Sequence, residues 1–213
     1  MLGRLRGLDF NVVGIGSAGP SYPQTYRQER EKAHMTPGAS TPRDALHFVI
    51  REEAPDDAMA VDDVIRAAFR DHPFSQQTEH LMVRGLRDAG ALSLSLVATL
   101  AGRVMASLAF SCVTIDGVDA AWWGLGPVSV MPPYRRAGIG SALIRSGLRR
   151  LTERGVHGCV VLGDLAYYGR FGFAAQPGLV YPGPPADHLL ALTLQGPAPA
   201  GEVSYHAAFA VKR

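Results

Sequence analysis

The sequence is poor in the features that mark disulfide-rich, membrane-spanning and nucleic-acid-binding proteins. Its 213 residues include two cysteines, Cys112 and Cys159, too few for a disulfide framework, which predicts free thiols in a reducing, cytoplasmic compartment. The formal net charge of +2 gives no reason to expect a nucleic-acid partner. No apolar run reaches the roughly 18 residues that a membrane-spanning helix needs, so no membrane partner is expected either.

The composition, 47% hydrophobic and 19% charged, is that of a globular protein. The chain is long enough for one domain and an appendage. We assign residues 1–44 to an N-terminal extension and linker, expected to be poorly ordered, and residues 45–213 to the domain. The extension contains a Gly-x-Gly-x-x-Gly string at residues 14–19. Pro20 follows directly and prevents the helix that a dinucleotide site requires, so we reject that interpretation.

The centre of the domain is a strand, a glycine-rich turn, a helix and a second strand. The apolar run Val128–Met131 precedes the turn Arg135–Ser141, a helical pattern extends from Ile139 to Arg154, and Cys159–Leu162 follows as a buried strand. This order predicts a βαβ unit with parallel strands and a right-handed crossover, and therefore an α/β protein.

The turn has the composition of an anion-binding site. Gly138 and Gly140 let the backbone approach a ligand, at a helix start where free N–H groups and the helix dipole favour negative charge. Arg135 and Arg136 add positive charge and bidentate donors, so the turn predicts a phosphate or pyrophosphate ligand. Taken alone, it is equally well explained as a tight turn with two solvated arginines. A P-loop is excluded because no Lys-Ser or Lys-Thr follows the glycines.

Two motifs in the right order extend this interpretation. Arg135-x-x-Gly-x-Gly140 opens the helix, and Tyr168-x-x-x-Gly-Phe173 follows the second strand. Together they resemble the signatures of the GNAT superfamily of acetyl-CoA-dependent N-acyltransferases. The strings Leu125–Val130 and Val161–Asp164 are similar to one predicted-acetyltransferase branch of that superfamily. The resemblance extends from about residue 45 to the C-terminus.

The resemblance implies a central mixed sheet, flanked by helices, with two parallel strands splayed apart to admit the pantetheine arm of acetyl-CoA. The pyrophosphate of this acyl donor would bind the turn, at Arg135, Arg136, Ala137, Gly138, Ile139, Gly140 and Ser141. Backbone groups of Val128 and Val130 would pair with the arm, since Gly124–Pro127 interrupts their strand and predicts a bulge. Tyr168 would be the general acid that protonates the CoA thiolate, with Tyr167 as the alternative.

Apolar patterning predicts the other elements. Strands are expected at 46–51, 92–99, 104–115, 119–130, 188–194 and 203–211, with turns at Gly102 and at Asp116–Gly117. Helices are expected after Pro55 and after Ser75, the latter residue as N-cap, and Asp164 is expected to cap a short helix.

The predicted activity is transfer of an acetyl group to an amine, on a small molecule or a peptide. His72, Phe74, Glu79 and His80 are candidates for acceptor contacts, although each is more simply explained as an ordinary surface or packed residue. The general base stays unassigned, because no glutamate occurs between Glu79 and Glu153. Three aspartates are the available carboxylates: Asp116, Asp119 and Asp164. A water relay or a backbone carbonyl is an equal alternative to them. A non-catalytic acyl-CoA-binding sensor or partner subunit is the alternative, and a homodimer is left open.

Overall fold

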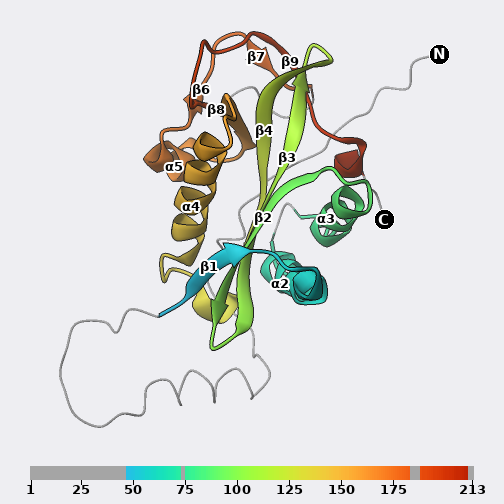
Figure 1. Ribbon diagram of the computed structural model, residues 1–213, viewed down its shortest axis with the longest axis vertical. Coiled ribbons are helices and arrows are strands. Elements are labelled where there is room, and N and C mark those ends of the chain that lie inside the picture. Colours follow the sequence, from blue (N-terminus) through green and yellow to red (C-terminus); the bar gives the residue numbers. More distant parts are fainter. Residues whose placement is uncertain (1–46, 73–74, 183–187, 211–213) are drawn as a thin grey trace, which may run out of the picture.

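A computed structural model describes residues 47–72, 75–182 and 188–210, and they form a mixed sheet covered by helices on both faces (Figure 1). Within these residues the strands are ordered β1-β2-β3-β4-β5-β8-β6, and β9 pairs with both β3 and β7. The strands are β1 Val49–Glu52, β2 Leu92–Leu100, β3 Arg103–Ile115, β4 Val118–Val130, β5 Gly158–Leu162, β6 Ala174–Ala175, β7 Leu179–Val180, β8 Leu189–Thr193 and β9 Gly201–Ser204. The predicted mixed sheet is confirmed.

The long antiparallel hairpins β2–β3 and β3–β4 form the middle of the sheet. The predicted turns join these strands. In the turn between β3 and β4, Asp116 and Gly117 lie in the left-handed region, with φ of 49° and 76°. Consecutive positive φ values give the tight two-residue turn that suits the twist of a hairpin. The strands on either side therefore pair in a fixed register, and β4 leads directly into the glycine-rich turn.

The helices divide between the two faces of the sheet (Figure 1). The crossover helix α4, Ile139–Glu153, packs Leu143 against Leu108 and Phe110 on one face. On the other face, α2 (Ala58–Phe69) and α3 (Glu79–Asp88) contribute Phe69 and Leu86 to a second core, which the 3-10 helix Ala207–Ala210 extends. Each face thus has its own apolar cluster, and the strands between them are buried on both sides.

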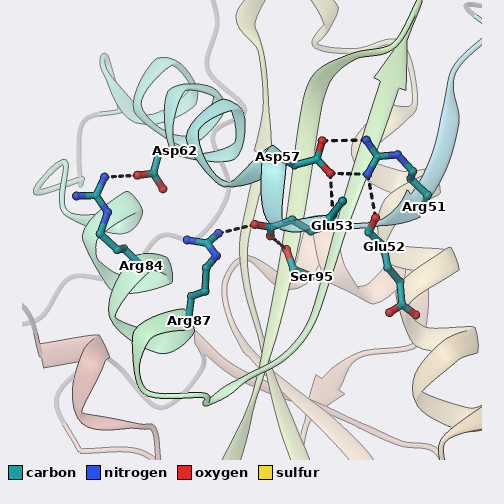
Figure 2. Close-up of polar contacts among 9 residues, drawn as sticks. Arg51, Glu52, Glu53, Asp57, Asp62, Arg84, Arg87 and Ser95 are labelled. Atoms are coloured by element: carbon teal, nitrogen blue, oxygen red, sulfur yellow. Dashed lines mark hydrogen bonds and ion pairs between the residues drawn. The ribbon is translucent and has the colours of Figure 1, made fainter.

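Ion pairs fix β1 and the helices that follow it. Arg51 binds both carboxylate oxygens of Asp57, at 2.5 and 2.9 Å. Glu53 lies between Arg87 of α3, at 2.6 Å, and the Ser95 hydroxyl of β2, as Figure 2 shows. Glu53 directly follows β1 and its side chain is only 7% exposed, so this bridge ties the end of β1 to β2 and α3 at a mostly buried point.

Three details differ from the sequence prediction. The helix expected after Ser75 begins at Glu79, and Ser75 instead accepts a hydrogen bond from the Gln77 N–H and donates one to the Glu79 carboxylate. The strand expected at 203–211 ends at Ser204, and residues 207–210 are helical because their apolar side chains pack on α3. The two-residue strands β6 and β7 were not predicted.

No helix in the described ranges combines the length and apolar character needed to cross a bilayer. The predicted extension at residues 1–44 lies outside the described residues.

Candidate active site

Strands β4 and β5 run parallel and separate after a short contact. Their pairing covers Trp122 to Gly124 on β4 and ends with Gly124 opposite Val160. On its other side β4 stays paired with β3, and the register slips between Leu125 and Val128, where two β4 residues face one β3 residue. The predicted bulge and splay are both confirmed. Within the described ranges, no strand pairs with β4 beyond Gly124 on the side away from β3.

The hydrogen-bond register shows which backbone groups face this unpaired side. The Met131 N–H donates to the Met105 carbonyl at 2.9 Å, and these residues are directly opposite in the register of β3 and β4. Hydrogen-bonded pairs alternate along an antiparallel ladder, so Ser129 also bonds to β3 while Val128 and Val130 do not. The N–H and C=O groups of Val128 and Val130 therefore point away from β3, toward the space that β5 has left.

The glycine-rich turn places the start of α4 beside that edge. Gly138, the residue before the helix, has φ of 82°, a conformation that favours glycine. The first N–H bonded within the helix is that of Ala142, which donates to the Gly138 carbonyl at 2.9 Å. The N–H groups of Ile139, Gly140 and Ser141 thus lie at the positive end of the helix dipole without intrahelical partners. Such an end is suited to a phosphate.

Gly140 marks where the turn, β4 and the second motif meet. A Cβ atom on Gly140 would lie 3.5 Å from the Tyr167 hydroxyl oxygen and 3.5 Å from Cγ2 of Val130. It would also lie 3.8 Å from Cγ1 of Val128. The glycine therefore keeps open the junction between the helix start, the unpaired edge of β4 and Tyr167.

The two arginines of the turn have different positions. Arg135 donates from its guanidinium to the Ala68 carbonyl at 2.6 Å and so ties the turn to the C-terminal end of α2. Arg136 is exposed, with φ of 63°. The exposed Arg136 guanidinium can reach a ligand at the helix start, and Arg135, whose Nε has no described partner, also holds the turn against α2.

Tyr168 is buried where β5 ends. It lies on the short helix α5, Leu165–Tyr168, whose start the Asp164 carboxylate caps by accepting the Ala166 N–H at 2.9 Å, as predicted. The Tyr168 ring packs on Gly163, where a Cβ would lie 2.3 Å from it, and stacks edge-on against Phe173 with centroids 5.8 Å apart. Gly163 thus makes room for the ring directly after β5.

The Tyr168 hydroxyl is buried and has no hydrogen-bond partner among the described residues. Burial raises the pKa of the Tyr168 phenol well above its ordinary range, and nearby Tyr167, Cys159 and Tyr205 add to the rise. The phenol therefore stays protonated throughout the working pH range. A buried hydroxyl without a partner is uncommon, because leaving it unpaired costs about 1–3 kcal/mol.

The carboxylates that the sequence offered as bases already have structural partners. Asp116 accepts the Glu202 N–H at 2.8 Å, Asp119 accepts the Ala121 N–H at 2.8 Å, and Asp164 caps α5. Each holds a turn or a helix start, so the structure gives no reason to assign one of them to proton transfer.

The candidate acceptor residues that the structure describes each have neighbours of their own. His80 is buried between α2 and α3, and burial followed by the charge of Arg66 lowers its pKa. Glu79 accepts the Ser75 hydroxyl at 2.6 Å, and the His72 ring lies 5.8 Å from that of Phe69. Phe74 lies outside the described residues.

Sequence reasoning missed Tyr205, which follows β9. A Cβ on Gly124 would lie 2.4 Å from Cε1 of Tyr205. The ring therefore covers the last β4 residue that pairs with β5. Nothing in the local pattern marked it, because its contact with Gly124 joins segments far apart in the sequence. The available signal was Gly124 itself, since a glycine within a strand can mark a close approach of another group.

Comparisons with known proteins agree with this geometry. A family model described as Acetyltransferase (GNAT) family matches residues 48–173. The uncharacterized N-acetyltransferase YhbS of Escherichia coli strain K12 is 40% identical over 127 residues, 59% of this chain and 73% of that protein. The uncharacterized N-acetyltransferase YjhQ of the same strain is 33% identical over 149 residues, 67% of this chain and 80% of that protein.

Two crystal structures give the same result in three dimensions. A GNAT family acetyltransferase from Brucella melitensis in complex with acetyl-CoA has a TM-score of 0.70 and 46% identity, over 77% of this chain and 99% of that chain. YhbS from Escherichia coli in complex with CoA has a TM-score of 0.72 and 34% identity, over 80% of this chain and 96% of that chain. The match to the family model, and the splayed strands beside a glycine-rich helix start, show that this chain belongs to the GNAT family of acetyltransferases.

Proposed function

We propose that this protein transfers the acetyl group of acetyl-CoA directly to an amine, with Tyr168 as the general acid. The observation that carries the proposal is the unpaired edge of β4 beside the start of α4. Val128 and Val130 offer backbone groups there, and Gly140 keeps the junction open. The related structures hold acetyl-CoA or CoA, which supports the same donor for this chain.

The turn would bind the pyrophosphate of the donor. The N–H groups of Ile139, Gly140 and Ser141 supply donors at the helix start, and Arg136 supplies an exposed guanidinium. Arg135 holds the turn in position through its hydrogen bond to the Ala68 carbonyl. The amide groups of the pantetheine arm would then pair with Val128 and Val130 as an added strand does.

The chemistry needs one proton delivered and one removed. The neutral amine attacks the acetyl carbonyl carbon, a C–N bond forms, and the C–S bond breaks with its electron pair on sulfur. The Tyr168 O–H protonates that sulfur and regains its proton from solvent. The proton that the amine nitrogen releases goes to water, since no carboxylate is assigned as a base.

The Tyr168 hydroxyl suits this task because it lacks a partner among the residues that the structure describes and is held neutral by burial. A neutral phenol beside the end of β5 can donate its O–H to the leaving sulfur as negative charge develops there, and the same low-dielectric surroundings that keep the phenol neutral also disfavour a free thiolate. Tyr167, whose hydroxyl lies at Gly140, is better placed to contact the arm of the donor.

The test is to follow CoA release from acetyl-CoA over a panel of amines: free lysine, a polyamine, peptides with free N-termini and an aminoglycoside. Amine-dependent release, with one acetyl group added to the amine by mass spectrometry, is the expected result. Binding of acetyl-CoA without release on any amine would contradict transferase activity and favour the acyl-CoA sensor. Absence of acetyl-CoA binding would contradict both functions.

A further inference from the structure

The face of the sheet opposite α4 carries a second buried phenol at the point where β4 and β5 separate. Tyr205 lies against Gly124, the last β4 residue that pairs with β5. Gly124 is preceded by Trp123 and followed by Leu125, which both face the α4 cluster, so a side chain at 124 would point to the other face. Tyr168 belongs to the α4 cluster, and the two phenols therefore approach the separation from opposite faces.

The Tyr205 hydroxyl, like that of Tyr168, is buried and lacks a hydrogen-bond partner within the described part of the chain. Its ring is held by neighbours: Tyr181 stacks edge-on with centroids 5.3 Å apart, and Phe209 lies 4.7 Å away. Burial raises the pKa of Tyr205 well above its ordinary range, and Cys159 and Tyr181 add to the effect. A packed ring with a free hydroxyl is a preorganised hydrogen-bonding group.

A second hydroxyl supports it. Ser111 of β3 is directly opposite Gly124 in the register, and directly opposite residues share a face. Its side chain therefore points to the same face as the Tyr205 ring, and its hydroxyl is also buried without a described partner. Two buried hydroxyls on one face, neither with a described partner, are costly unless something bonds to them, which supports a ligand on this face.

We propose that Tyr205 is an acceptor-binding residue, whose hydroxyl oxygen accepts a hydrogen bond from an N–H of the attacking amine. This rests on the proposed acetyl transfer. The donor would occupy the α4 face, where the helix start, Val128, Val130 and Tyr167 lie, so the amine must arrive from the opposite face. A neutral phenol can hold a neutral amine by its N–H and leave the nitrogen lone pair free for attack. Tyr205 lies outside residues 48–173, which match the family model.

The experiment compares the full-length wild-type protein with Tyr205→Phe and with Tyr181→Phe, which removes the hydroxyl of the neighbouring stacked ring. Hydroxylamine is the amine probe, because it is small and largely neutral near pH 7, and its direct reaction with acetyl-CoA, measured without protein, is subtracted from every rate. Tyr205→Phe should raise KM for hydroxylamine about 2- to 10-fold, the range expected for one lost hydrogen bond. KM for acetyl-CoA should not change, and Tyr181→Phe should alter neither value.

Thermal unfolding separates binding from a structural role. Because the Tyr205 hydroxyl has no described partner, Tyr205→Phe should keep or raise Tm. A lower Tm with unchanged KM for hydroxylamine would show a structural hydroxyl and overturn the proposal. So would equal kinetics of wild type and Tyr205→Phe. If the wild-type protein released no CoA with either hydroxylamine or the amine panel, the proposed acetyl transfer would be contradicted. The proposed role of Tyr205 would then be contradicted as well.

Discussion

Replacing Tyr168 with phenylalanine should affect stability and catalysis in opposite directions. The substitution keeps the ring that packs on Gly163 and Phe173 and removes a hydroxyl that has no described partner. An unpaired buried hydroxyl costs about 1–3 kcal/mol, and the small void left by its removal costs about 1 kcal/mol at most. The unfolding free energy should therefore stay the same or increase by up to about 2 kcal/mol.

For a domain of this size, 1 kcal/mol corresponds to a change in Tm of about 2–4 °C. Differential scanning calorimetry of the unliganded protein should show Tm unchanged or raised by a few degrees. Loss of a general acid should lower kcat about 10²- to 10⁴-fold, measured by CoA release. Tyr167→Phe is the comparison, since it removes a neighbouring hydroxyl that lies at Gly140, and it should change KM for acetyl-CoA rather than kcat. A clear fall in Tm, or kcat close to that of wild type, would refute this account of Tyr168.

Three further outcomes follow from the structure. Gly140→Ala should fold normally, because its Cβ would make contacts no shorter than 3.5 Å, while Gly140→Leu should lose acetyl-CoA binding by calorimetry, since the larger side chain fills the junction. Glu53→Gln should lower the unfolding free energy by about 1–3 kcal/mol in urea titrations, because Glu53 is 7% exposed and bonded to Arg87, whereas Glu52→Gln, at a 53% exposed residue, should have little effect. Stability should fall as pH rises above about 8.5–10, because the unfolded chain releases the Cys159 and tyrosine protons there while burial raises their pKa values in the folded state. Each such group lowers the unfolding free energy by up to about 1.4 kcal/mol per pH unit, and in Cys159→Ala the decline should begin at a higher pH in Tm measurements.

The parts of the fold that depend on residues adjacent in the sequence were predictable from the sequence. The hairpin turn at Asp116–Gly117, the helix that begins after Gly138 and the cap at Asp164 are each determined by a few adjacent residues, and the structure confirms all three. The interrupted strand at Gly124–Pro127 also signalled its bulge correctly, since glycine and proline weaken ladder pairing wherever they occur.

Long-range packing accounts for what the sequence did not reveal. The Arg135 guanidinium donates to the Ala68 carbonyl, a contact that depends on how α2 packs against the turn and that no adjacent residue indicates. Residues 207–210 are apolar enough for a strand, but they form a 3-10 helix packed against α3. Tyr205 reaches Gly124 from the end of the chain, and no local pattern predicts which distant side chain covers a strand glycine.

The most direct test of the account is calorimetric titration of acetyl-CoA into wild type, Gly138→Trp and Gly117→Trp. Both glycines have positive φ, 82° and 76°, and for both a Cβ would meet nothing within 4 Å, so the substitutions impose similar strain in open surroundings. Wild type and Gly117→Trp should bind acetyl-CoA alike, whereas Gly138→Trp should not bind it. Equal binding by all three proteins, or no binding by wild type, would contradict the placement of the donor on the turn at the start of α4.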